Sequence, residues 1–148
     1  MNLATAEPVP SHLMLSTRLI SELGDSHSTL RATTQRDGSA VMVYAGGEID
    51  AWNEGTWRHL LCEAAAAAAP PGPLVIDTNG VDFMGCCAFA VLADESYRCR
   101  RRGVDLRLVS RQPVVSRVIG TCGLSGLLPV HPTVDSALSA AAAGSPGW

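Results

Sequence analysis

Residues 74–92 read LVIDTNGVDFMGCCAFAVL, and this stretch predicts the fold of the chain. Leu74–Ile76 is a short, unbroken apolar run, as expected of a strand that is covered on both faces of a sheet. A polar turn over Asp77–Gly80 separates it from a second strand-like run, Val81–Met84. A helix then follows from about Cys87 to Arg102. The stretch is therefore a strand–helix unit of an α/β domain.

Upstream of this unit, the pattern predicts a β-hairpin and then a helix. Leu30–Thr34 and Val41–Tyr44 have strand character, and Asp37–Gly38 marks the tight turn between them. Gly46–Gly47 breaks the regular pattern after the second strand. Asn53 is a good N-cap residue for the helix that follows. That helix has one apolar stripe at helical spacing: Trp57, Leu60, Leu61, Ala64, Ala65 and Ala68.

Downstream, strand and helix patterns continue to alternate. Val104–Val109 and Leu127–Val130 are predicted strands, and Thr133 is the predicted cap of a final helix. Between the two strands, Pro113 suits the first turn of a helix. That helix is expected to bury Val114, Val115, Val118 and Ile119. A hairpin followed by β–α units predicts a mixed, mostly parallel sheet of about five strands with about four helices.

The chain divides into three parts by composition. Residues 1–28 form an N-terminal extension, expected to be flexible or to contain a short helix within His12–Leu23. Residues 29–140 form the α/β domain, and the Ala/Gly/Ser/Pro-rich residues 141–148 are expected to be a flexible tail. The extension is a candidate for packing on the domain or on a second subunit, so a homodimer is one expectation.

Charge and composition exclude several classes of partner. The chain has 148 residues and a formal net charge of −3, which argues against nucleic acid as a bulk electrostatic partner. No apolar run approaches the length of a membrane span. The N-terminus lacks the basic start and apolar stretch of a secretory signal, so the expected location is the cytoplasm.

The five cysteines predict neither a disulfide framework nor a metal site. Their number is odd, and cytoplasmic thiols are kept reduced. None of them has CxxC or zinc-finger spacing to other Cys or His residues. We expect no metal and no cofactor.

Three stretches in this order and spacing resemble the STAS domain of bacterial anti-sigma factor antagonists. They are GEID at residues 47–50, the stretch at 74–92, and RRGVDLRLVSRQPVVSRVIGTCGLSGLLPVHPTVDSAL at 101–138. The resemblance implies the STAS fold and a non-enzymatic, cytoplasmic regulator. It also implies a protein partner, an anti-sigma factor of the serine-kinase type, whose capture releases a sigma factor.

The family's phosphorylation motif is altered in this chain. The typical motif is Asp-Ser-Ser-Gly, with the second serine as phosphoacceptor, and it aligns here with Gly85, Cys86, Cys87 and Ala88. Cys87 therefore occupies the phosphoacceptor position without a hydroxyl, and the usual phosphate switch is not available there. From the resemblance we expect partner binding without phosphorylation, through Glu48, Asp50, Asn53, Gly85, Cys86, Cys87 and Phe89.

The residues leave other interpretations open. Cys86 and Cys87 at a helix start are either small core residues or, with a thiolate stabilised by the helix dipole, a redox switch with Cys122 as resolving thiol. A third interpretation is an oligomerising scaffold without sigma control. Catalysis has little support, because no histidine is placed to act as the base of a nucleophilic cysteine. Gly46–Gly47 does not match a phosphate-binding loop.

Overall fold

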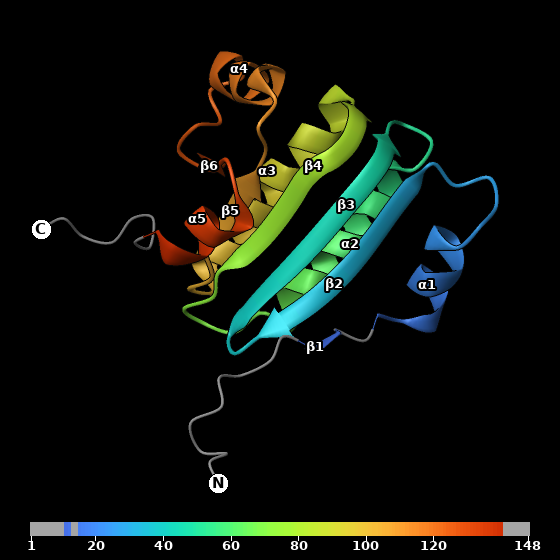
Figure 1. Cartoon of the computed structure of the whole chain (residues 1–148), viewed down its shortest axis with the longest axis horizontal. Helices are drawn as coiled ribbons and strands as arrows, with labels where there is room; N and C mark the ends of the chain where they lie inside the picture. Colours follow the sequence, from blue (N-terminus) through green and yellow to red (C-terminus); the bar gives the residue numbers. More distant parts are fainter. Residues whose placement is uncertain (1–10, 13–14, 141–148) are drawn as a thin grey trace, which may run out of the picture.

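The computed structural model describes residues 11–12 and 15–140 and contains one six-stranded sheet in the order β1-β2-β3-β4-β5-β6 (Figure 1). The strands are β1 (Ser11–His12), β2 (Leu30–Asp37), β3 (Ala40–Ile49), β4 (Leu74–Met84), β5 (Leu106–Val109) and β6 (Val130–His131). The helices are α1 (Thr17–Leu23), α2 (Glu54–Ala67), α3 (Cys86–Arg101), α4 (Pro113–Thr121) and α5 (Val134–Ser139). The predicted mixed, mostly parallel α/β class is confirmed.

The sheet combines an antiparallel edge with a parallel remainder. β1, β2 and β3 pair antiparallel, whereas β3, β4, β5 and β6 pair parallel. Helices α2, α3 and α4 make the parallel crossovers, and crossovers of uniform hand place them on one face. Figure 1 shows α2 and α3 behind β2, β3 and β4. Because the strand order never reverses, this sheet has no switch point of the kind at which doubly wound sheets bind nucleotides.

Both faces of the central strands are buried, as the unbroken run at Leu74–Ile76 predicts. Leu74 and Ile76 lie in the main core between the sheet and helices α1 to α4. Val75 points to the opposite face, where a smaller cluster forms with Ala137 of α5. The two clusters hold β4 in the middle of the fold, so its carboxyl end has a fixed position.

The predicted hairpin is confirmed. The two interruptions of strand structure predicted at Gly46–Gly47 and Asp77–Gly80 do not occur. β3 continues through Gly46–Gly47 to Ile49, with register shifts against β4 on either side of these glycines. Gly47 has φ +88°, and a Cβ there would lie 1.9 Å from the Thr29 carbonyl oxygen, so only glycine fits. The predicted turn at Asp77–Gly80 is wrong, because β4 runs unbroken from Leu74 to Met84. The polar residues of β4 are accommodated by these irregularities in pairing with β3.

The N-terminal extension is partly integrated into the domain. The expected helix over His12–Leu23 is shorter, because α1 begins after Ser16, whose hydroxyl accepts a hydrogen bond from the Leu19 N–H. Leu19 is fully buried in the main core. Ser11–His12 pairs with β2 and adds a strand to the predicted sheet. Residues 1–10 of the predicted extension and the predicted flexible tail at 141–148 lie outside the described residues.

The C-terminal elements follow the prediction with two corrections. Pro113 begins α4 and Thr133 caps α5 through a capping box with Ser136, as expected. Val114, however, is half-exposed and not buried, because the buried positions of α4 are Val115 and Ile119, four residues apart on one face of the helix. The last strand lies at Val130–His131, later than expected. No helix within residues 11–12 and 15–140 is long and apolar enough to span a bilayer.

Candidate functional site

The loop between β3 and α2 is pinned by the side chain of Asn53. Its Oδ1 accepts a hydrogen bond from the Asp50 N–H at 2.9 Å. Its Nδ2 donates to the Glu48 carbonyl oxygen at 2.8 Å and to Thr29 Oγ1 at 3.1 Å. Asn53 stands at the N-cap position of α2, but its side chain makes no capping bond. Asn53 thus fixes the loop from within rather than presenting a free side chain to a partner.

This fixed loop presents a tryptophan to solvent. Trp52 is 96% exposed, the most exposed of the large apolar side chains that the structure describes. Its backbone N–H donates to Asp50 Oδ1 at 3.0 Å, which adds a local turn. Sequence reasoning missed Trp52. The available signal was its position outside the apolar stripe that includes Trp57.

Gly85 connects β4 to α3 and is hydrogen-bonded to the end of β3, where this loop begins. The Gly85 N–H donates to the Ile49 carbonyl oxygen at 2.8 Å, so the ends of β3 and β4 are tied together. Gly85 is the N-cap residue of α3 with φ −73°, a backbone conformation open to any residue. A Cβ there would make ordinary contacts, 3.7 Å from Phe83 Cε2 and 3.8 Å from Cys87 Sγ. Glycine is therefore not required by the backbone at this position.

The two thiols of the turn differ in their surroundings. Cys86 is exposed, whereas Cys87 is half-buried beside Glu54 of α2. Burial and the Glu54 carboxylate raise the pKa of the Cys87 thiol, and hydrogen bonds from the backbone N–H groups of Cys87 and Ala88 offset only part of this. The redox interpretation assumes that the helix start lowers this pKa, whereas burial and Glu54 shift it in the opposite direction at Cys87.

The remaining predicted site residues differ in solvent exposure. Glu48 is exposed and Asp50 half-exposed. Phe89 is only 4% exposed and belongs to the main core, so the structure does not present it as a surface contact. Cys122 is exposed at the C-cap of α4. Phe83, which the sequence did not single out, is 55% exposed at the end of β4.

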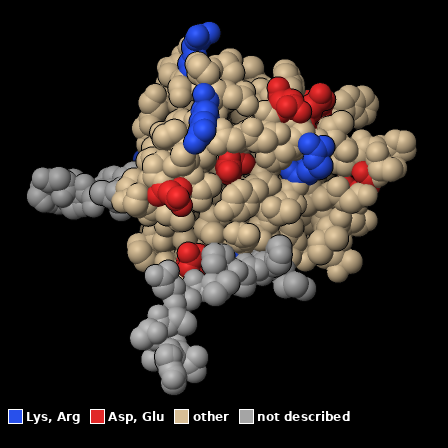
Figure 2. Space-filling view, in the orientation of Figure 1, with Lys and Arg blue, Asp and Glu red and all other residues tan. Residues whose placement is uncertain are grey.

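We name the exposed side chains of this region the loop-end surface: Glu48, Asp50, Trp52, Phe83 and Cys86. It lies at the carboxyl ends of two neighbouring parallel strands. Figure 2 shows acidic side chains gathered where β3 and β4 end. An apolar ring beside carboxylates on a fixed backbone suits the binding of a protein with a basic, partly apolar surface.

The described residues offer little for cofactor or metal chemistry. No group of three or more His, Cys, Asp or Glu side chains among them is arranged to hold a metal ion. His59, the histidine nearest to the loop in sequence, lies on α2 beside Glu63, with Nε2 at 3.2 Å from Oε2.

Comparison with known families decides which fold family this is. The sequence model of the STAS domain matches residues 31–137. The chain belongs to the STAS domain family. The predicted family and the fold that it implies are thereby confirmed.

Close relatives and a solved structure agree with this assignment. The chain is 60% identical over 144 residues, 97% of both chains, to the provisionally named anti-anti-sigma factor Rv2638 of Mycobacterium tuberculosis. It is 61% identical over 113 residues to the anti-sigma-F factor antagonist RsfA of the same organism, covering 76% of this chain and 88% of RsfA. The crystal structure of an anti-sigma factor antagonist from Mycobacterium paratuberculosis superposes with a TM-score of 0.67 at 26% identity. It covers 77% of this chain and 95% of that one.

Proposed function

We propose that this STAS protein is an anti-sigma factor antagonist that binds an anti-sigma factor of the serine-kinase type and so releases a sigma factor. The names of the relatives at 60% and 61% identity support the antagonist role. They also favour a regulatory binding protein over an enzyme. The observation that carries the proposal here is Trp52, exposed on a loop that the side chain of Asn53 holds in place and that follows Ile49, whose carbonyl oxygen accepts the Gly85 N–H.

The physical basis is preorganised binding. An exposed tryptophan contributes a large contact area, and tryptophan is enriched among residues that dominate binding energy. Because the hydrogen bonds of Asn53 already order the loop, little conformational entropy is lost when a partner covers it. The carboxylates of Glu48 and Asp50 favour a partner whose facing surface is basic.

Reconstitution tests the antagonist role. Each anti-sigma factor of the source organism is purified in complex with its sigma factor, and the STAS protein is added. We expect release of the sigma factor from at least one complex. We expect Trp52→Ala to weaken release about tenfold or more. Tyr97→Ala is the matched control, an aromatic residue 55% exposed on α3 outside the loop-end surface, and should behave as wild type. Failure of the wild type to release any sigma factor contradicts the proposal.

Regulation at position 87 is a separate part of the proposal. With ATP and a kinase-type anti-sigma factor, we expect no phosphate on the wild-type chain at Cys87, because a thiol replaces the acceptor hydroxyl. Cys87→Ser restores the hydroxyl at the start of α3 and should be phosphorylated, with loss of binding through charge repulsion that includes the neighbouring Glu54. A Cys87→Ser variant that binds the kinase but stays unmodified contradicts the assignment of position 87 as the phosphoacceptor equivalent.

A thiol switch is the second candidate, and the exposure of Cys86 and Cys122 favours it. Hydrogen peroxide would oxidise the Cys86 and Cys122 thiols by two electrons. Its O–O bond breaks, one disulfide forms, and the two thiol protons leave in two molecules of water. Mass spectrometry after mild peroxide treatment tests it. Unmodified Cys86, Cys87 and Cys122 in a folded protein would end this candidate.

A further inference from the structure

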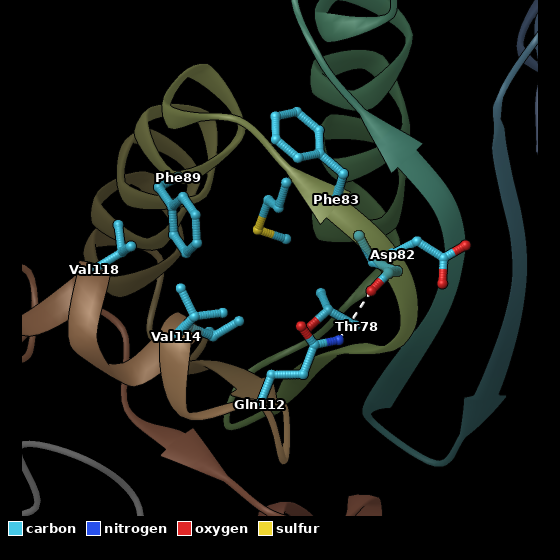
Figure 3. Close-up of a pocket in the computed structure, with 10 residues that line it drawn as sticks. Thr78, Asp82, Phe83, Phe89, Gln112, Val114 and Val118 are labelled. Carbon is cyan, nitrogen blue, oxygen red and sulfur yellow. Dashed lines mark hydrogen bonds between the residues drawn. The ribbon is translucent and has the colours of Figure 1, made fainter.

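An apolar pocket opens beside the loop-end surface, between the end of β4, the start of α3, and α4 (Figure 3). We call it the β4–α4 pocket. Its volume is about 180 Å³. Its apolar walls come from Val81, Phe83 and Met84 of β4, Phe89 of α3, and Val114 and Val118 of α4. A cavity of roughly 150 Å³ with aliphatic and aromatic walls is large enough to hold a benzene ring. The pocket therefore matches one ring-sized apolar group.

Two polar side chains that line the pocket, those of Gln112 and Thr78, already have partners within the fold. Gln112 Nε2 donates to the Val81 carbonyl oxygen at 2.9 Å, the dashed bond in Figure 3. Thr78 Oγ1 donates to the Val109 carbonyl oxygen at 2.9 Å. A polar ligand would find these donors engaged, and breaking such bonds without replacement is costly. The interior of the pocket thus favours an apolar occupant.

The pocket is continuous with the loop-end surface. Phe83 lines the pocket and is also half-exposed beside the turn, where a Cβ on Gly85 would lie 3.7 Å from its Cε2 atom. Val114, on the opposite side of the pocket, is 51% exposed. One partner that covers the turn can therefore reach the pocket with a side chain.

Carboxylates stand outside the pocket on the β4 side. Figure 3 shows the Asp82 carboxylate directed away from the cavity. Glu48 pairs in register with Phe83, the residue after Asp82. Both side chains are exposed, and neither has a hydrogen bond or ion pair to another residue in the described part of the chain. These charges are available to a cation that accompanies the apolar group.

We propose that the β4–α4 pocket receives one aromatic or large aliphatic side chain of the anti-sigma factor, flanked in that partner by a Lys or Arg that faces Asp82 and Glu48. The inference rests on the proposed function, since it assigns this pocket to the same partner. In this proposal two contacts contribute most of the binding energy. Trp52 projects from this chain toward the partner, and the partner projects a side chain into this chain.

Two variants on one helix test the pocket. Val114→Asp places a charge at its mouth at a half-exposed position, and Ser116→Asp adds the same charge at an exposed position of α4 outside the pocket lining. We expect Val114→Asp to lower the affinity for the anti-sigma factor about tenfold or more, and Ser116→Asp to change it by less than about twofold. Circular dichroism and thermal unfolding are used to check that both variants fold.

A second measurement examines the pocket without the partner. Free indole serves as the ring-sized probe in a ¹H–¹⁵N NMR titration of the wild-type chain. We expect chemical-shift changes centred on the pocket-lining residues, and we expect Val118→Phe, which fills the pocket, to remove them. Shifts absent from these residues would overturn the inference.

The outcomes separate this inference from the proposed function. If the wild type binds the anti-sigma factor and Trp52→Ala weakens binding, but Val114→Asp binds as wild type, the pocket inference is wrong and the proposed function stands. A wild-type chain that binds no anti-sigma factor overturns both. Weakened binding by Val114→Asp together with indole shifts in the pocket supports the inference.

Discussion

Two tryptophans five residues apart mark two regions with opposite roles. Trp57 of α2 is fully buried, and its Nε1 donates to the Ala88 carbonyl oxygen in the first turn of α3 at 3.2 Å. Trp52, on the loop before α2, is almost fully exposed. The interior between α2 and α3 therefore fixes the position of the turn, and the loop-end surface is free to bind. Stability and binding should respond to different substitutions.

The largest expected effect separates the two tryptophans directly. Trp57→Ala should lower the free energy of unfolding by about 3–5 kcal/mol, because it empties a core site and leaves the Ala88 carbonyl without its partner. Trp52→Ala should change it by less than about 0.5 kcal/mol, since the side chain is in water. Urea unfolding followed by circular dichroism measures both. Similar losses for the two variants would contradict the division into two regions.

The N-terminal helix extends the same contrast to a leucine and an isoleucine. Leu19→Ala should cost about 2–3 kcal/mol of unfolding free energy, because Leu19 is fully buried in the main core. The adjacent Ile20 is 52% exposed, so Ile20→Ala should be nearly neutral in the monomer. Thermal unfolding compares the two. A larger loss for Ile20→Ala, with a change in oligomeric state by light scattering, would favour the expected homodimer through this segment.

A smaller effect is expected at the far end of the helix pair. Arg102 donates to the carbonyl oxygens of Ala65 and Ala68 at 2.8 and 3.2 Å, at the end of α2. Arg102→Ala should cost about 1 kcal/mol of unfolding free energy and leave partner affinity unchanged, because this end is remote in the fold from the loop-end surface. Arg101, whose guanidinium lies over the Tyr97 ring, provides the control. Arg101→Ala should lower the free energy of unfolding by less than Arg102→Ala does. Weakened partner binding in Arg102→Ala would show that the two ends are coupled.

The smallest expected effect concerns the Cys87 thiol. Removing the Glu54 charge with Glu54→Gln should lower the pKa of Cys87, because a neighbouring negative charge disfavours the thiolate. The alkylation rate at Cys87, followed against pH by fragment-ion mass spectrometry, should then rise at a lower pH. Asp94→Asn is the control, because Asp94 has no part in raising this pKa. An unchanged profile in Glu54→Gln would contradict the account of the raised pKa.

The sequence was sufficient for the fold where local pattern and burial agree. The apolar run at Leu74–Ile76 and the proline and threonine at the starts of α4 and α5 all predict elements that the structure contains. It failed at Asp77–Gly80, because strand pairing with β3 overrides the turn preference of these residues.

The site was predictable only in outline. The resemblance located the turn at Gly85–Cys87, but it did not show that Phe89 is buried or that Asn53 uses its side chain within the loop. Nor did periodicity show that Trp52 is exposed, since a tryptophan in sequence is more often at least partly buried. The pKa of Cys87 depends on Glu54, which reaches it from another helix. Such contacts arise from tertiary structure and leave no local pattern.

Calorimetric titration of the purified chain and its Trp52→Ala variant into the anti-sigma factor most directly tests the loop-end surface as the binding site. We predict stoichiometric binding by the wild type and a Kd about tenfold or more higher for Trp52→Ala at unchanged unfolding free energy. Equal Kd values for the two proteins would show that the loop-end surface is not the binding site.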